Sequence, residues 1–220
     1  MKATSLKTAA LLAGSIALLA GNATAQATAT SGVVGYETLD YVSGFNFVGA
    51  RLHETPVASG TLETVTATTA EDDDVDLGAL ITSGTYILEI EDGSGIIQEV
   101  TTATGSVLNV ADLTGVAAGA AYTLRPSATL ASIFGAANES GLTSVAAFGG
   151  SDQVWLPDGA GGFNKYYFAA GAFGAAGEWK DDGGASVTAS SVEIPSSYIV
   201  NNTGGAQEVV TTAPSFYAGL

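Results

Sequence analysis

The chain has 220 residues, a formal charge of −16 from 22 acidic and six basic residues, and no cysteine. This acidic balance argues against nucleic acid and anionic membrane surfaces as partners. The lack of cysteine excludes disulfides, thiol catalysis and thiolate metal sites, so a chain long enough to bury a sizeable core must be held together by that core.

Residues 1–25 have the pattern of a signal peptide. Two lysines precede an apolar stretch at residues 9–20, and small residues mark a cleavage site at 23–25. The apolar stretch is too short for a comfortable membrane span, and no second one follows. We therefore expect a secreted protein that begins at Gln26, has no membrane span after signal removal, and resides in the periplasm, at the cell surface or outside the cell.

Short runs of β-branched and aromatic residues then alternate with turn residues along the chain. Such runs at regular spacing predict an all-β fold, an antiparallel sandwich or barrel of short strands. Two hairpins are expected around the Asp-Gly turns at 92–94 and 158–162. The predicted strands are 33–42, 45–52, 62–69, 84–91, 95–102, 107–110, 121–124, 153–156, 163–168, 187–194, 198–201 and 207–211.

Residues 127–138 are the one stretch that predicts a short helix. Its apolar residues recur at helical spacing, Ser127 or Thr129 can cap its start, and Gly135 or Asn138 can end it. We expect this helix to separate two units. The predicted division is an N-terminal β unit at 26–125, the helix and a connector at 126–150, and a C-terminal β unit at 151–220, with one continuous domain over 33–213 as the alternative.

The acidic run at 71–76 is a candidate metal site. Asp72, Asp74 and Asp76 match the first half of an alternating calcium loop, but Leu77 stands where that loop requires glycine. The run is therefore not an EF-hand. A looser surface Ca²⁺ site is one hypothesis; a solvated loop whose charges keep sheet edges apart is favoured over it. No other cofactor is expected.

No catalytic constellation stands out in the sequence. His53 is the one histidine, and it is expected at a strand end on the surface, where zinc would lack a second imidazole or thiolate. A nucleophile-elbow motif is absent, and the glycine-rich loops lack the lysine of a phosphate-binding loop. We therefore expect neither an enzyme nor a catalytic residue.

Aromatic residues concentrate between residues 151 and 184, which contain both tryptophans. Because successive strand residues point to opposite faces, Tyr166 and Phe168 share one face and Tyr167 lies on the other. One face is expected to be core. Trp155, Tyr167 and Trp179 are the candidates for a binding surface on the other face.

Several short motifs, in their order along the chain, resemble a family of secreted Gly/Thr/Ala-rich proteins of unknown function from Verrucomicrobia and related bacteria. The resemblance implies export and a β-rich fold, and it transfers no catalytic residue. The motifs that carry it are the signal peptide, VGY at 34–36, TLASIFG at 129–135, VWLPDG at 154–159, and YYF at 166–168 followed by a tryptophan.

Together these features predict an exported, non-enzymatic structural or adhesive surface or extracellular protein. One alternative is a carbohydrate-binding β module that uses exposed aromatics to bind a glycan. The other is a self-polymerising fibre subunit, in which residues 26–32 complete the sheet of a neighbour. Glycan binding and self-association are thus the two partner hypotheses.

Overall fold

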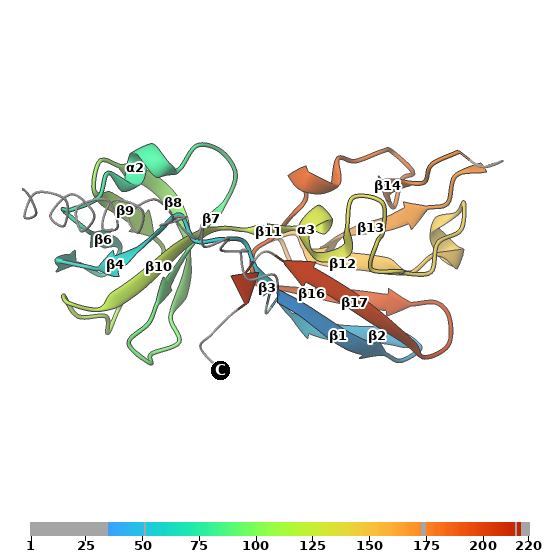
Figure 1. Ribbon diagram of the computed structural model, residues 1–220, viewed down its shortest axis with the longest axis horizontal. Coiled ribbons are helices and arrows are strands. Elements are labelled where there is room, and N and C mark those ends of the chain that lie inside the picture. The colour runs from blue at the N-terminus through green and yellow to red at the C-terminus, as the bar shows by residue number, and fades with distance from the viewer. Residues whose placement is uncertain (1–34, 51, 173–174, 214, 217–220) are drawn as a thin grey trace, which may run out of the picture. The chain divides into compact units, whose positions relative to one another are not determined.

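The computed structural model describes residues 35–50, 52–172, 175–213 and 215–216, and the described chain is mostly strand (Figure 1). The predicted all-β class is confirmed: every strand pairing in the described ranges is antiparallel. The predicted signal peptide and the predicted donor segment at 26–32 lie outside these residues. Within them, no helix has the length and apolarity needed to cross a membrane.

The elements are short, as the turn spacing predicts. The described ranges contain the helices α2 (Leu77–Leu80) and α3 (Leu130–Phe134) and the 3₁₀ turns η1 (Phe148–Gly150) and η3 (Ala189–Ser191). The strands are β1 (Gly35–Tyr41), β2 (Gly44–Gly49), β3 (Leu52–His53), β4 (Ala58–Thr61), β5 (Thr64–Val65), β6 (Thr69–Glu71), β7 (Tyr86–Ile90), β8 (Ile97–Thr104), β9 (Val107–Val110), β10 (Ala121–Pro126), β11 (Ala128–Thr129), β12 (Gln153–Pro157), β13 (Phe163–Ala169), β14 (Glu178–Asp181), β15 (Glu193–Ile194), β16 (Ser197–Asn202), β17 (Gln207–Ala213) and β18 (Ser215–Phe216).

A seven-stranded sheet, in the order β4-β10-β7-β8-β9-β6-β5, is built from the first half of the chain. Its β7–β8 hairpin forms where the Asp-Gly turn predicts it, with Gly93 at φ +85° and Gly95 at φ +70°. These positive φ angles suit glycine, which has no Cβ to clash. The sheet packs on its own core, which includes Leu62, Leu77, Leu88, Leu108, Tyr122 and Leu124.

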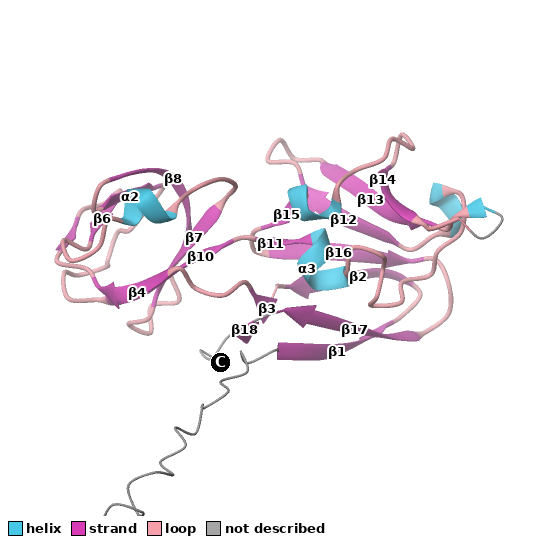
Figure 2. Cartoon of the chain, turned by 45° about the horizontal axis from the view of Figure 1, so that its top comes forward, coloured by secondary structure: helices cyan, strands magenta, loops and turns pink. Residues whose placement is uncertain are grey.

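A five-stranded sheet has the order β14-β13-β12-β16-β2 (Figure 2). Its strands β12 and β14 contain the two tryptophans. The predicted second hairpin joins β12 to β13. In its turn, Oδ1 of Asp158 accepts hydrogen bonds from the backbone N–H groups of Ala160 and Gly162, both at 2.8 Å. These two bonds favour the ionised carboxylate and lower the pKa of Asp158.

A long antiparallel ribbon reverses direction between two sheets. β2 pairs with β16 up to Gly44 and Asn202, and β1 pairs with β17 from Tyr41 and Gln207, so residues 42–43 and 203–206 form the reversal. Asparagine side chains form hydrogen bonds with backbone groups of this reversal. On the shorter side Asn46 bonds both the N–H and the C=O of Val42, at 3.0 and 2.9 Å. β1 and β2 therefore follow each other in sequence without pairing.

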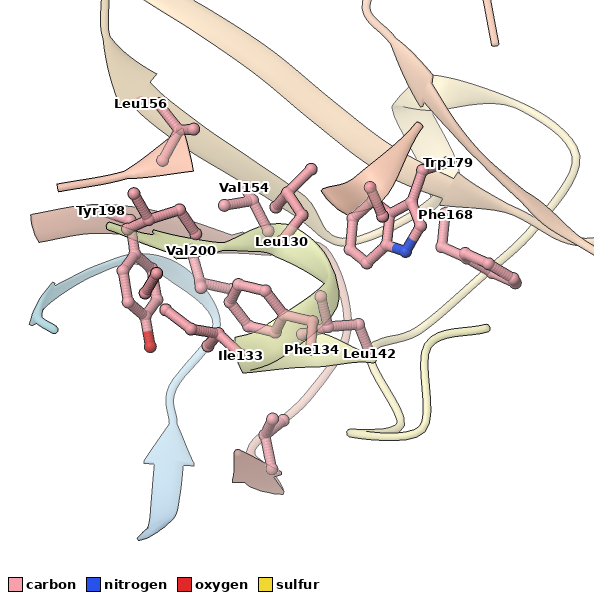
Figure 3. Packing of buried hydrophobic residues seen from close by; sticks show 14 of the residues in the cluster. Leu130, Ile133, Phe134, Leu142, Val154, Leu156, Phe168, Trp179, Tyr198 and Val200 are labelled. Atoms are coloured by element: carbon pink, nitrogen blue, oxygen red, sulfur yellow. The ribbon is translucent and has the colours of Figure 1, made fainter. Parts of the chain in front are cut away.

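The helix α3 fills the space that this reversal encloses. Thr129 caps it reciprocally with Ser132, and Gly135 ends it at φ +88°, as the sequence predicts, although the helix is shorter than residues 127–138. The centroid of its Phe134 ring lies 5.3 Å from the ring centroid of Tyr198 on β16 (Figure 3). Members of this core come from α3, the inner face of the five-stranded sheet and the β1–β17 ribbon: Leu130, Ile133, Phe134, Val154, Phe168, Trp179, Tyr198, Val200, Tyr41 and Val209.

The strand pairings extend beyond the predicted units. β2 belongs to residues 26–125 but hydrogen-bonds β16 of the C-terminal segment. The sheets therefore do not follow a boundary at residue 125, while the division of the chain into independently folding units stays a prediction.

Candidate functional site

The outer face of the five-stranded sheet, opposite α3, is the candidate site. Residues that pair across antiparallel strands project from the same face. Trp155 pairs with Lys165 on one side and with Ile199 on the other, and Ile199 in turn pairs with Phe47. These four side chains therefore form one row across β13, β12, β16 and β2.

Four aromatic residues gather along this row, and we call Phe45, Phe47, Trp155 and Phe163 the aromatic face. The Trp155 ring centroid lies 4.9 Å from that of Phe45 and 5.8 Å from that of Phe163. Phe45, Phe47 and Phe163 remain 54%, 81% and 41% exposed. An apolar groove of about 370 Å³ runs between Phe47 and Phe163. Large apolar side chains so exposed and so close together are typical of an interaction surface.

Polar groups hold the central indole in place. The Trp155 Nε1–H donates to Oε1 of Gln153 at 3.0 Å, and Asn201 Nδ2 donates to the same oxygen at 3.1 Å. Gln153 Nε2 donates to the carbonyl of Phe148 at 3.1 Å, which fixes the amide. From above, Lys165 Nζ lies 4.5 Å from the centre of the Trp155 ring, a cation–π geometry.

The charge of this face contrasts with that of the chain. Lys165 and Lys180 lie on it, because Lys180 pairs with Tyr167 and Tyr167 is two residues from Lys165. The carboxylate of Glu178 accompanies them on β14, and it contacts Lys180 at 3.0 Å. A protein of charge −16 thus presents a sheet face that is apolar and close to neutral.

The structure separates the three predicted binding aromatics. Trp155 lies on the aromatic face. Tyr167 projects from the same side, but it is only 4% exposed because the Phe148 ring packs edge-on against it at 5.4 Å. Trp179 pairs with Phe168, so it lies on the opposite, inner face and is 2% exposed. The prediction of Tyr167 and Trp179 as surface-binding residues is therefore wrong.

Three members of the aromatic face were not predicted from the sequence. Phe45 and Phe47 lie more than a hundred residues before Trp155 in the chain and join it through the β2–β16 pairing. The alternation Phe-Asn-Phe at 45–47 is the local signal that both rings share one face. Phe163 pairs with Pro157 across the second hairpin. Because Pro157 lies two residues after Trp155 on β12, Phe163 projects from the same face as Trp155.

Only two of the three predicted metal-binding aspartates lie close together in the structure. Carboxylate oxygens of Asp72 and Asp74 lie within 4.8 Å of each other and of Glu63, which precedes the run. Asp76 instead caps α2, accepting the N–H of Ala79 at 3.1 Å. Among the described residues, the acidic group thus contains Glu63 in place of Asp76, and a Ca²⁺ site there stays a prediction.

Asp72 has a structural partner inside this group. The hydroxyl of Tyr122 donates to Asp72 Oδ2 at 2.6 Å, and both side chains are buried. Burial and this hydrogen bond raise the pKa of Tyr122. A Cβ on Gly60 would lie 2.8 Å from Asp72 Oδ2, so the missing side chain lets β4 approach the carboxylate closely. The hydrogen bond from Tyr122 compensates in part for the loss of water around the buried Asp72 side chain.

His53 is buried rather than exposed. It ends β3 as expected, but only 7% of it is exposed, so the surface position predicted from the sequence is wrong. Burial, together with the charge of Arg125, lowers its pKa to about 4. Arg125 is itself buried, and its Nε lies 3.7 Å from Oε2 of Glu89. An imidazole with this pKa is a weak base at neutral pH.

We expect His53 to make the fold sensitive to acid. The folded protein keeps the ring neutral down to a pKa of about 4, whereas the unfolded chain binds a proton near 6.5. The unfolded state therefore holds the additional proton between these values, and stability falls as the pH falls through this window. Urea unfolding at pH about 7 and about 4.5 should show wild type losing on the order of 1–2 kcal/mol more than His53→Gln. Equal losses would contradict a neutral buried ring.

The fold and the site define an all-β protein with an apolar, exposed sheet face and with its one histidine buried among the described residues. No protein-family model, curated protein or solved structure matches the chain. The resemblance to secreted Gly/Thr/Ala-rich proteins therefore stays a prediction from the sequence.

Proposed function

We propose that this chain is an exported, non-enzymatic adhesive protein that attaches to apolar or neutral surfaces through the aromatic face. The observation that carries the proposal is the gathering of Phe45, Phe47, Trp155 and Phe163 on one sheet face whose net charge is close to zero, in a strongly acidic chain. The acidic remainder keeps the protein soluble, while this face can be removed from water on contact. The signal-peptide pattern of residues 1–25 supports export to the periplasm, cell surface or exterior.

The ring geometry favours adhesion over stacking on a sugar. A glycan chain would lie flat on aromatic rings that share one plane. The Phe45 and Phe163 rings are instead inclined to Trp155 by 68° and 48°, and the Lys165 ammonium lies over that indole. A rough apolar surface of this kind suits contact with another apolar surface. Glycan binding by Asn201 and the exposed rings is the second candidate, since an amide beside aromatic rings suits a neutral sugar.

Phe163→Ser should weaken adhesion about tenfold. The ring is 41% exposed, so its contact area is worth on the order of 1–2 kcal/mol when it is buried against a surface. The measurement is the partition of purified mature protein between solution and phenyl-coated beads, compared with uncoated beads and with insoluble cellulose and chitin. Retention on the polysaccharides but not on the phenyl-coated beads would contradict adhesion to apolar surfaces and would support glycan binding instead.

Ile97→Ser is the matched control. Ile97 is 44% exposed, close to the value for Phe163, but it lies on β8 of the seven-stranded sheet. We expect this variant to bind the phenyl beads like wild type. Equal loss in both variants would show that general surface hydrophobicity, and not the aromatic face, drives attachment, and would overturn the proposal.

A further inference from the structure

The strand β2 forms one edge of the five-stranded sheet, and its own sequence has neither a charge nor a proline. It ends the order β14-β13-β12-β16-β2, so one side of its backbone has no partner strand among the described elements. Proteins usually protect such an edge with charges, proline or a very short strand. β2 has the sequence GFNFVG over six residues, without charge or proline.

The other described edges of the two large sheets are charged and covered, or are shorter than β2. β14 has the sequence EWKD, and its Lys180 also bridges to Ser186, which covers that side. At the ends of the seven-stranded sheet, β5 has two residues and β4 has four. Among the described edges of the two large sheets, β2 is thus both the longest and one of those free of charge. Exposed N–H and C=O groups in an apolar strand are a template for another strand.

We infer that β2 is a self-association edge, at which two copies of this chain pair β2 to β2 in antiparallel orientation. The Phe-Asn-Phe sequence at 45–47 is symmetric about Asn46. Pairing Asn46 with Asn46 of a second copy places Phe45 opposite Phe47 twice, on the outer face. Aromatic pairs opposite each other stabilise antiparallel strands, and a two-fold axis repeats each contact.

Burial and charge both favour a second copy at this edge. Phe47 is 81% exposed and borders the apolar groove, so Phe45 of a second copy would cover a ring that otherwise faces water. Two strongly acidic chains repel each other at a distance, and they repel least where neither strand carries a charge. Self-association at β2 is distinct from the proposed adhesion, because it uses the backbone N–H and C=O groups of the strand edge in addition to the side chains of the aromatic face.

Phe47→Lys should weaken the dimer at least tenfold, since it places two ammonium groups in the paired strands. The measurement is sedimentation equilibrium of mature protein from about 1 to about 100 µM, at about 0.05 and 0.5 M NaCl. Wild type should form dimers that strengthen with salt, because salt screens the repulsion between acidic chains. Hydrogen exchange should show β2 amides becoming protected as concentration rises.

Phe163→Ser separates this inference from the proposed adhesion. Phe163 lies on β13, an interior strand of the sheet, so this variant should show the weakened bead binding and keep the wild-type dimer. Wild type that stays monomeric at about 100 µM would overturn the inference. So would a dimer that Phe47→Lys leaves intact, or one whose β2 amides exchange as in the monomer. Circular dichroism of each variant checks that it remains folded.

Discussion

Replacing Trp179 by alanine should lower the free energy of unfolding by about 3–5 kcal/mol, the usual effect of truncating a fully buried large aromatic side chain. The indole is 2% exposed and packs at 6.1 Å from the ring of Phe134 and at 5.6 Å from that of Phe168. Its Nε1–H also donates to the carbonyl of Gly135 at 3.0 Å. The substitution therefore opens a cavity between α3 and the sheet and removes the shorter of the two hydrogen bonds to that carbonyl, which keeps only the N–H of Asn138 at 3.3 Å.

Trp155→Ala is the matched control, because it removes the same ring from the opposite face of the same sheet. Trp155 is partly exposed, and we expect a loss of about 1–2 kcal/mol. Urea unfolding followed by circular dichroism measures both. If the two variants lose equal stability, the inner face is not the core of this sheet. A binding test based on Trp179 would report unfolding, so Trp155 and Phe163 are the residues to change when adhesion is measured.

Local features of the fold follow from the sequence. The Asp-Gly turns at 92–94 and 158–162 form hairpins because glycine supplies positive φ angles and the aspartates accept backbone N–H groups. Thr129 and Gly135 cap and end α3 for similar local reasons. Each of these interactions spans only a few residues, so a single sequence is enough to predict it.

Other stretches were predicted incorrectly because side-chain-to-backbone bonds compete with strand pairing. The strand predicted at 62–69 is interrupted where Oγ1 of Thr66 accepts the N–H groups of Thr68 and Thr69, at 3.3 and 3.0 Å. The strand predicted at 187–194 contains the turn η3, and within this range the structure forms only the two-residue strand β15. Threonine favours strands by propensity, yet threonine and serine side chains also stabilise turns. The sequence alone does not say which tendency prevails.

The candidate site could not be predicted from the sequence for a different reason. Trp155 was identified because aromatic residues cluster around it, but Phe45 and Phe47 reach it through a pairing between β2 and β16. Which of two alternating faces is core depends on α3, whose position is set by tertiary packing. Tyr167 and Trp179 were misplaced for the same reason: the sequence shows the alternation of faces but not which face is covered.

Asp152→Asn should cost about 2–4 kcal/mol of stability, although it changes one atom. The carboxylate is 0% exposed. Its Oδ1 accepts the N–H of Thr203 at 2.8 Å, and its Oδ2 accepts the N–H of Thr143 and Nε2 of Gln207, both at 2.8 Å. Thr203 and Gln207 lie at the two ends of the reversal between β16 and β17. Asp152 thus holds the bend that carries the β1–β17 ribbon over α3.

An asparagine at this position cannot satisfy the same donors. Its amide nitrogen must replace one oxygen and would then face a backbone N–H, from Thr143 or from Thr203, that cannot rotate away. Asp158→Asn is the matched control, since both of its backbone donors bind a single oxygen, Oδ1, which an amide also provides. We expect the control to lose less than about 1 kcal/mol. Urea unfolding of both variants gives the comparison, and near-equal losses would show that packing alone, without this carboxylate, maintains the reversal from which the aromatic strand β2 begins.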